Sequence, residues 1–252
     1  PPISGVGGGG CLTLLKNRLY LFGGCSRSGA CSSALTCFDI DTSTWIELLP
    51  GDHLGSAPPS PRYGHTVAAA FPNSAIVVFG GSSSSTSSFN DLHVYDTRTN
   101  RWSCVDQGSA EDESAEDHFG QANRPMPRNS HTAVETLDGK TMILFGGANA
   151  EVGPMNDMWT LDLRSLDEID TGGDEAGENK VQWERVGSGI ESSDNGKADD
   201  DSSTPWPEAR EMHSACIVPL NGPSDKDGDH LGMIVMGGRK ADGSACQDMW
   251  LF

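Results

Sequence analysis

Four short apolar runs in the sequence each end in two glycines. They read RLYLFGG, AIVVFGG, TMILFGG and GMIVMGG, and their glycine pairs are Gly23-Gly24, Gly80-Gly81, Gly146-Gly147 and Gly237-Gly238. Sixteen positions after the first glycine, three copies have an aspartate, namely Asp39, Asp96 and Asp162. A tryptophan follows in the same three copies, as Trp45, Trp102 and Trp183. Self-similarity of this kind indicates one supersecondary unit copied along the chain.

The spacing inside the units is constant, whereas 57, 66 and 91 residues separate one first glycine from the next. Insertions therefore fall in loops. The runs are apolar at consecutive positions, which is typical of strands buried on both faces. We predict an all-β fold with four short strands per unit. The units span 1–48, 61–105, 127–186 and 208–252, and the last one ends before its outermost strand.

Further landmarks appear in the segments PRYGHTVAAA, AIVVFGG and NDLHVYDTRTNRW and in their counterparts. Arginine, histidine, Gly-Gly, aromatic-Asp and tryptophan stand there at matching offsets. In this pattern nearly the whole chain resembles the Kelch repeat. The resemblance implies a β-propeller of four-stranded antiparallel blades, with about four blades present and the last incomplete. The alternative, a WD repeat, has a period of about 40–45 residues and other signatures.

The first unit departs from this pattern. Counted back from Gly23, Gly5 and Gly8 fall where the arginine and histidine are expected, and Ser33-Ala34 replaces Asn-Asp. Kelch propellers usually have five to seven blades, so the resemblance implies a fragment of a ring with uncovered apolar faces. Three explanations stay open: blades outside this chain, partner subunits that cover the edges, or a truncated product.

The repeated glycines, tryptophans and aspartates have structural explanations. The Gly-Gly pairs permit positive φ where the second strand turns into a loop. We expect Trp45, Trp102 and Trp183 to pack between adjacent blades. We expect the repeated aspartates to cap turns by accepting backbone N–H groups.

The formal net charge of −19 disfavours nucleic acid and anionic membranes, because binding phosphates requires lysine and arginine. Most of this charge lies in acidic insertions, for which we predict mobile surface loops at 106–126, 165–180 and 187–207. Solubilising insertions are the simpler interpretation and an acidic docking surface the alternative. No apolar stretch reaches 18 residues, and the first ten residues lack the basic start and apolar run of a secretory signal, so we expect no membrane span or signal in this sequence.

The seven cysteines form no C-x-x-C pair and are odd in number, which argues against a zinc site or a complete disulfide framework. We therefore expect a reducing compartment, the cytoplasm or the nucleus. The even spacing of Cys25, Cys31 and Cys37 leaves a secreted, disulfide-bonded domain as the alternative.

No motif predicts catalysis, a cofactor or a metal. A G-x-G-x-x-G pattern at Gly5 follows no strand, and a calcium-loop-like run at Asp225 has Met236 in place of the final carboxylate. The repeated His65, His131 and His213 fall in different blades, so we expect structural roles for them. We predict a non-catalytic protein.

The function expected from a propeller is binding of a protein or peptide partner at the face that carries the loops between blades. Fixed arginine forks suit carboxylates, so we interpret Arg62, Arg128 and Arg210 as a partial ring of guanidinium groups at the channel mouth, with Tyr63 and Asn129 as specificity positions. The simpler alternative is that each arginine pairs inside its own blade. Two other functions stay open: a sugar-binding or sugar-isomerising propeller, and an accessory domain of a larger enzyme.

Overall fold

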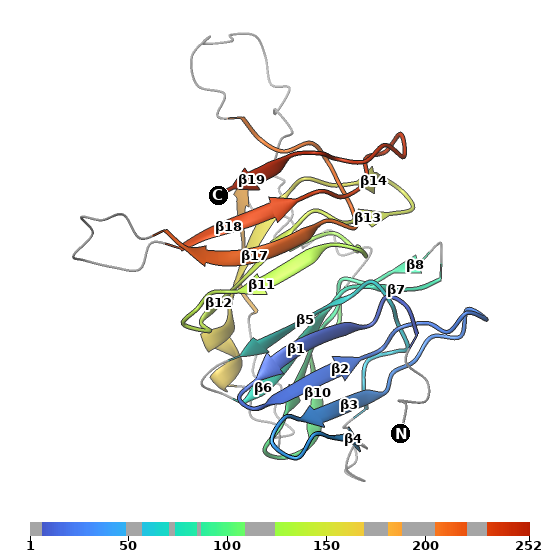
Figure 1. The fold of residues 1–252 in the computed structure, drawn as a ribbon, viewed down its shortest axis with the longest axis vertical. Helices are drawn as coiled ribbons and strands as arrows, with labels where there is room; N and C mark the ends of the chain where they lie inside the picture. The colour runs from blue at the N-terminus through green and yellow to red at the C-terminus, as the bar shows by residue number, and fades with distance from the viewer. Residues whose placement is uncertain are drawn as a thin grey trace.

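Short β-strands, with one 3-10 helix, form the described part of the chain. The computed structural model describes residues 7–48, 57–70, 74–84, 87–108, 124–168, 181–187, 205–220 and 231–252. Most of each predicted acidic insertion lies outside these residues. Consecutive strands pair antiparallel into four sheets, which follow one another around a common axis as the blades of a propeller (Figure 1). The all-β propeller prediction is confirmed.

The first two blades have four strands each. In the first blade these are β1 (Cys11–Leu15), β2 (Arg18–Phe22), β3 (Leu35–Asp39) and β4 (Thr44–Leu48). In the second they are β5 (Thr66–Ala70), β6 (Ala75–Phe79), β9 (Leu92–Asp96) and β10 (Arg101–Asp106). The short strands β7 (Ser82–Ser84) and β8 (Ser87–Ser88) pair with each other between β6 and β9.

The third blade repeats this plan and the fourth has three strands in the described part of the chain. The third contains β11 (Thr132–Glu135), β12 (Thr141–Phe145), β15 (Met158–Asp162) and β16 (Trp183–Gly187), with the hairpin β13 (Ala148–Asn149) and β14 (Gly153–Pro154) between β12 and β15 and η2 (Leu163–Glu168) after β15. The fourth contains β17 (Ser214–Pro219), β18 (Leu231–Met236) and β19 (Met249–Leu251). The expected incomplete last blade is therefore present.

The innermost strands lie side by side in the order β1, β5, β11 and β17 (Figure 1). Strand burial follows from this order. Every residue of β5 and β6 is buried, because the second blade lies between the first and the third. In β1 only Thr13 and Leu15 are buried, since no blade of the described part of the chain covers its other face. Burial at every position is thus a feature of the second blade, whereas β11 and β12 of the third blade, which also has two neighbours, are only partly buried.

Three hydrophobic clusters fill the three junctions between successive blades. At the first, the ring of Trp102 lies 5.3 Å from that of Phe22 in the preceding blade, and at the second Trp183 lies 4.9 Å from Phe79. The prediction that the tryptophans pack between blades is correct for these two. It is wrong for Trp45, which packs on Phe38 of its own blade and is 37% exposed, because no blade precedes it among the described residues.

The repeated aspartates cap turns as predicted. Oδ1 of Asp39 accepts the backbone N–H of Thr42 at 3.1 Å, and Oδ1 of Asp96 accepts that of Arg98 at 2.7 Å. Asp162 does the same with Arg164, at 2.9 Å.

The alignment of the first blade needs a correction of two residues. Gly8 forms an isolated bridge with Cys25, and this bridge is equivalent to the one that Tyr63 forms with Ser82 in the second blade. Gly7 and Gly10 therefore take the arginine and histidine positions, in place of Gly5 and Gly8. The count from Gly23 misses this because the first hairpin turns within two residues, between Leu15 and Arg18.

Candidate functional site

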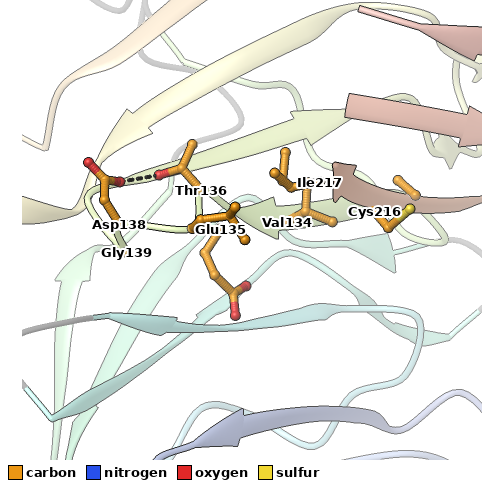
Figure 2. A pocket seen from close by; sticks show the side chains of 9 residues that line it. Val134, Glu135, Thr136, Asp138, Gly139, Cys216 and Ile217 are labelled. Carbon is orange, nitrogen blue, oxygen red and sulfur yellow. Dashed lines mark hydrogen bonds between the residues drawn. The ribbon is translucent and has the colours of Figure 1, made fainter. Parts of the chain in front are cut away.

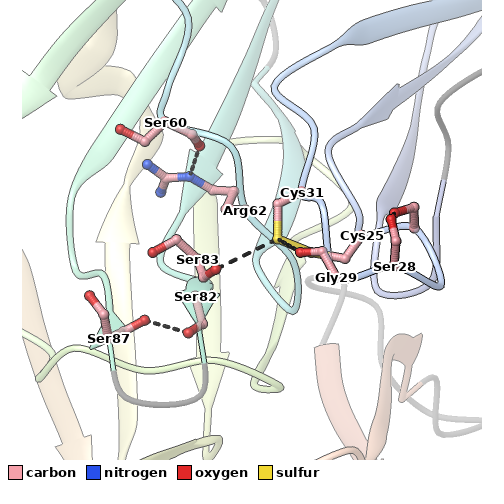
Figure 3. The surroundings of a disulfide bond; sticks show 10 residues. Cys25, Ser28, Gly29, Cys31, Ser60, Arg62, Ser82, Ser83 and Ser87 are labelled. Carbon is pink, nitrogen blue, oxygen red and sulfur yellow. Dashed lines mark hydrogen bonds between the residues drawn. A yellow bond between two sulfur atoms is a disulfide. The ribbon is translucent and has the colours of Figure 1, made fainter.

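Each of the last three blades holds a buried arginine at the start of its innermost strand. Arg62 donates from Nη1 and Nη2 to the two carboxylate oxygens of Asp91, at 2.7 and 2.8 Å, and from Nη1 to Gly80 O at 2.8 Å. Its Nε donates to Ser60 O at 3.0 Å (Figure 3). We call this arrangement the arginine clamp. The other two clamps are Arg128 with Asp157 and Gly146 O, and Arg210 with Asp248 and Gly237 O.

The clamps hold their carboxylates ionised. Burial raises the pKa of Asp91, but the hydrogen bonds from Arg62 and His93 outweigh it and bring that pKa down to about 2. At Asp157 burial is likewise outweighed by Arg128, and the pKa is lowered. The hydrogen bond from Arg210 lowers the pKa of Asp248. A bidentate pair with an additional backbone acceptor satisfies most of the guanidinium donors within the blade.

The expected ring of accessible guanidinium groups at the channel mouth is therefore wrong. The side chains of Arg62, Arg128 and Arg210 are 0% exposed. The simpler alternative, pairing inside each blade, is what the structure shows. Asp91, Asp157 and Asp248 recur eleven positions after the first glycine of the last three Gly-Gly pairs, but the sequence pattern alone did not identify them as the carboxylates that pair with the arginines. One feature of the sequence indicates the pairing: in the first blade the arginine and the aspartate of the clamp are both absent, and Gly7 and Ala34 stand in their places.

The repeated histidines lie in the junctions between blades. Nε2 of His65 is 3.1 Å from Phe22 O, and the two rings meet edge to face at 5.2 Å. His131 and His213 meet Phe79 and Phe145 in the same way, at 5.6 and 5.3 Å. Burial, followed by the nearby arginine charge, lowers the pKa of His65 to about 3 and that of His213 to about 4. These histidines are neutral parts of the core.

A chain of backbone hydrogen bonds runs around the axis beside the clamps. Met212 N–H donates to Ser130 O, Ser130 N–H to Gly64 O, and Gly64 N–H to Gly9 O, at 2.7–2.9 Å. All four residues have left-handed backbone, with φ between 55° and 74°. The residues just before them are Gly8, Tyr63, Asn129 and Glu211, which we call the mouth positions.

The mouth positions sit on one backbone framework but differ in side chain. Tyr63 bridges to Ser82, Asn129 to Ala148 and Glu211 to Arg239, so each lies beside the loop that follows its Gly-Gly pair. The three side chains are half-buried. Nδ2 of Asn129 donates to Ser88 Oγ at 3.1 Å, and the Glu211 carboxylate accepts from Arg239 Nη2 at 2.6 Å. Tyr63 and Asn129, the predicted specificity positions, therefore lie at equivalent places beside these loops.

A disulfide closes the corresponding loop of the first blade. A disulfide bonds Cys25 to Cys31 (Figure 3). It spans a short hairpin, in which Ser26 N–H donates to Ala30 O at 2.9 Å. This pair is one of those that the cysteine spacing left open. Together, the loops 25–31 and 239–245 and the hairpins β7–β8 and β13–β14 form what we call the loop face.

A cleft lies at the opposite ends of the inner strands, between the β11–β12 turn and β17 (Figure 2). Its volume is about 440 Å³ and its lining includes Leu137, Asp138 and Cys216. Glu135 extends away from Thr136 and Asp138 toward the second blade (Figure 2), and burial raises the pKa of its carboxyl group. In the described part of the chain, no three acidic, histidine or cysteine side chains converge as metal ligands. The calcium-loop-like run at Asp225 lies outside the described residues.

Comparison with known proteins agrees with this geometry. The model of the KLHDC2/KLHL20/DRC7 Kelch-repeats domain matches residues 9–165, more than half of the chain. The chain belongs to the Kelch-repeat family. Kelch propellers generally bind protein partners and are generally non-catalytic interaction modules. No helix among the described residues has the length and apolar character needed to cross a membrane.

Several curated proteins are similar to this Kelch chain. It is 37% identical over 149 residues to acyl-CoA-binding domain-containing protein 5 of Arabidopsis thaliana, covering 59% of this chain and 20% of that protein. It is 28% identical over 238 residues to the flagellar outer arm dynein alpha chain of Chlamydomonas reinhardtii, a match that covers 92% of this chain and 4% of that protein. It is 29% identical over 159 residues to human Kelch domain-containing protein 10, a match that covers 63% of this chain and 32% of that protein. The chain thus spans about a third or less of the length of these relatives.

Proposed function

We propose that this Kelch chain is a non-catalytic scaffold or adaptor that binds a protein or peptide partner at its loop face. The observation that carries this proposal is the set of mouth positions. A left-handed residue follows each mouth position in all four blades, and a clamp precedes it in the last three, while the side chain changes from glycine to tyrosine, asparagine and glutamate. A fixed framework with variable side chains is typical of a recognition surface.

The surroundings of the mouth positions support partner binding. Loops on a rigid scaffold commonly carry binding residues, and the hydroxyl-rich β7–β8 hairpin and the exposed Arg239 lie beside Tyr63 and Glu211. Tyrosine, asparagine and serine supply contact area and adaptable hydrogen bonds at protein interfaces. The small share of each relative that the chain matches also fits an interaction unit that belongs to larger proteins.

The test is selection of binding peptides from a random displayed library on the immobilised chain. Binding should weaken at least about tenfold in the double variant Tyr63→Ala with Asn129→Ala, while the melting temperature stays that of the wild type. Val186→Ala, on the exposed outer strand β16, is the matched control and should bind normally. Peptides that bind the double variant as tightly as the wild type, but no longer bind the Val186→Ala variant, would contradict the proposal.

We also propose that the protein is located in the cytoplasm or the nucleus. Five of the seven cysteines are free thiols, which is usual in a reducing compartment, whereas the Cys25–Cys31 disulfide is the one feature that favours the secreted alternative. Fluorescence imaging of the tagged protein tests this, and accumulation in the secretory pathway would contradict it.

A further inference from the structure

Two loops of the loop face have the same length and the same backbone pairing, although only one of them contains a disulfide. They are loop 25–31 of the first blade and loop 239–245 of the fourth. In each loop the first and last residues form an isolated antiparallel bridge, Cys25 with Cys31 and Arg239 with Ala245.

The backbone hydrogen bonds of the two loops also agree. In loop 25–31, Ser26 N–H donates to Ala30 O at 2.9 Å and Gly29 N–H donates to Ser26 O at 3.0 Å. The equivalent distances in loop 239–245 are 2.9 and 3.0 Å. The glycines at the two turns share a left-handed φ, of 85° at Gly29 and 83° at Gly243. The fourth blade thus builds this loop without a disulfide, so the bond in the first blade is not needed for the shape of the loop.

The disulfide is accessible to reagents in solution. Cys25 and Cys31 are half-buried, and all five residues between them are exposed. Reduction begins when a thiolate reaches one of the two sulfurs, so exposed disulfides are the labile, regulatory or catalytic ones. The bridge also keeps the two cysteines opposite each other, so the same bond re-forms after reduction.

The other five cysteines are free thiols, and three of them are shielded from thiol chemistry. Burial raises the pKa of Cys11 and Cys37, and burial followed by nearby aspartates raises the pKa of Cys104 to about 11. Because the thiolate is the reactive form, these three thiols react slowly at neutral pH. Reversible disulfide exchange is therefore expected at the Cys25–Cys31 pair.

Both cysteines lie beside mouth positions. Cys25 N–H donates to the carbonyl oxygen of Gly8, the mouth position of the first blade, at 2.9 Å. Sγ of Cys31 lies 3.8 Å from Ser83 O in β7 of the second blade (Figure 3). Strand β7 also forms the isolated bridge with Tyr63, the mouth position of that blade. A change at the disulfide therefore reaches two neighbouring mouth positions.

We propose that Cys25 and Cys31 form a reversible redox site that exchanges with small thiols of the glutathione class. A small-molecule thiolate attacks one sulfur of the bond and forms a mixed disulfide, and the other cysteine leaves as a thiolate that takes up a proton. A second small thiolate attacks the mixed disulfide, which frees the first cysteine and yields the oxidised small disulfide. Two electrons and two protons thus pass from two small thiols to the protein, and the reverse sequence restores the Cys25–Cys31 bond.

A reversible site accounts for a disulfide in a chain that also has five free thiols, because disulfides of reducing compartments are usually transient and catalytic or redox-sensing. Reduction leaves the blade folded and gives loop 25–31 more freedom. A partner that binds the loop face must then order this loop, which weakens its affinity. This consequence, but not the redox site itself, rests on the proposed function.

Thiol counting after equilibration of the wild-type chain in glutathione buffers tests the redox site. Maleimide labelling of the denatured protein, read by mass, should find five thiols in the most oxidising buffer and all seven in the most reducing one. The circular dichroism spectrum should stay that of the folded protein throughout. The control, Cys25→Ser with Cys31→Ser, should fold and show five thiols in every buffer. A wild type that keeps the bond until it unfolds, or never forms it, would overturn the proposal, as would a control that does not fold.

Peptides selected on the oxidised chain test the consequence for binding. The oxidised chain should bind them at least about threefold more tightly than the reduced chain, and the double serine variant should bind like the reduced chain in both buffers. Equal affinities in the two redox states would overturn this consequence. If no peptide binds the loop face in either state, the proposed function fails, whereas the thiol count still decides the redox site.

Discussion

The clamp of Arg128 is the residue-scale feature with the largest expected effect on stability. Arg128→Ala leaves Asp157 buried without its partner, which costs about 3–5 kcal/mol in such pairs. We expect the free energy of unfolding in urea to fall by this amount. The control is Arg164→Ala, whose exposed pair with Asp162 should contribute nothing measurable to the melting temperature. Equal effects of the two changes would contradict a structural role for the clamp.

The junction histidines predict a loss of stability in mild acid. The folded-state pKa of His65 is about 3, that of His213 is about 4, and burial lowers that of His131, against about 6.5 in the unfolded chain. Below about pH 6.5 the unfolded chain therefore binds more protons, so stability is full above this pH and falls as the pH falls. Between pH 6 and 5 each of the three histidines should lower the free energy of unfolding by up to about 1.4 kcal/mol, which is up to about 4 kcal/mol in all. Equal stability at pH 5 and 7 would be inconsistent with neutral buried histidines.

At the scale of strands, the tryptophans separate covered from uncovered blades. Trp102 is 3% exposed between the first two blades, so Trp102→Ala should cost about 3–5 kcal/mol. Trp45→Ala removes the equivalent residue from a strand that no other blade covers among the described residues, and we expect a markedly smaller loss of stability. Urea unfolding of both variants decides this, and equal losses would contradict the difference in burial.

The Gly-Gly pairs allow a similar comparison of elements. Gly146→Ala and Gly237→Ala both place a side chain at positive φ, which is unfavourable at either position. Only at Gly146 does the new methyl group also meet the next blade. We therefore expect a larger fall in melting temperature for Gly146→Ala, and the reverse order would contradict the assigned junction.

The blades could be predicted from the sequence, but the orientation of the side chains at the candidate site could not. Regular offsets of Gly-Gly, Asp and Trp predict strands and turns because each blade repeats one local structure. They do not show where a side chain points: Arg62 was expected at the channel mouth but turns into its own blade, where a carboxylate and two carbonyls accept its donors. Burial of Trp45 failed as a prediction because it depends on a neighbouring blade and not on the local pattern.

At the scale of the whole molecule, three rigid junctions hold the mouth positions on one face, and the central claim is that this face binds a partner. Hydrogen–deuterium exchange of the chain with a selected peptide tests the claim most directly. Protection should appear at residues 63–64, 129–130 and 211–212 and in the hairpins β7–β8 and β13–β14. Protection confined to the outer strands β4, β10 and β16, or to the cleft at the β11–β12 turn, would contradict it.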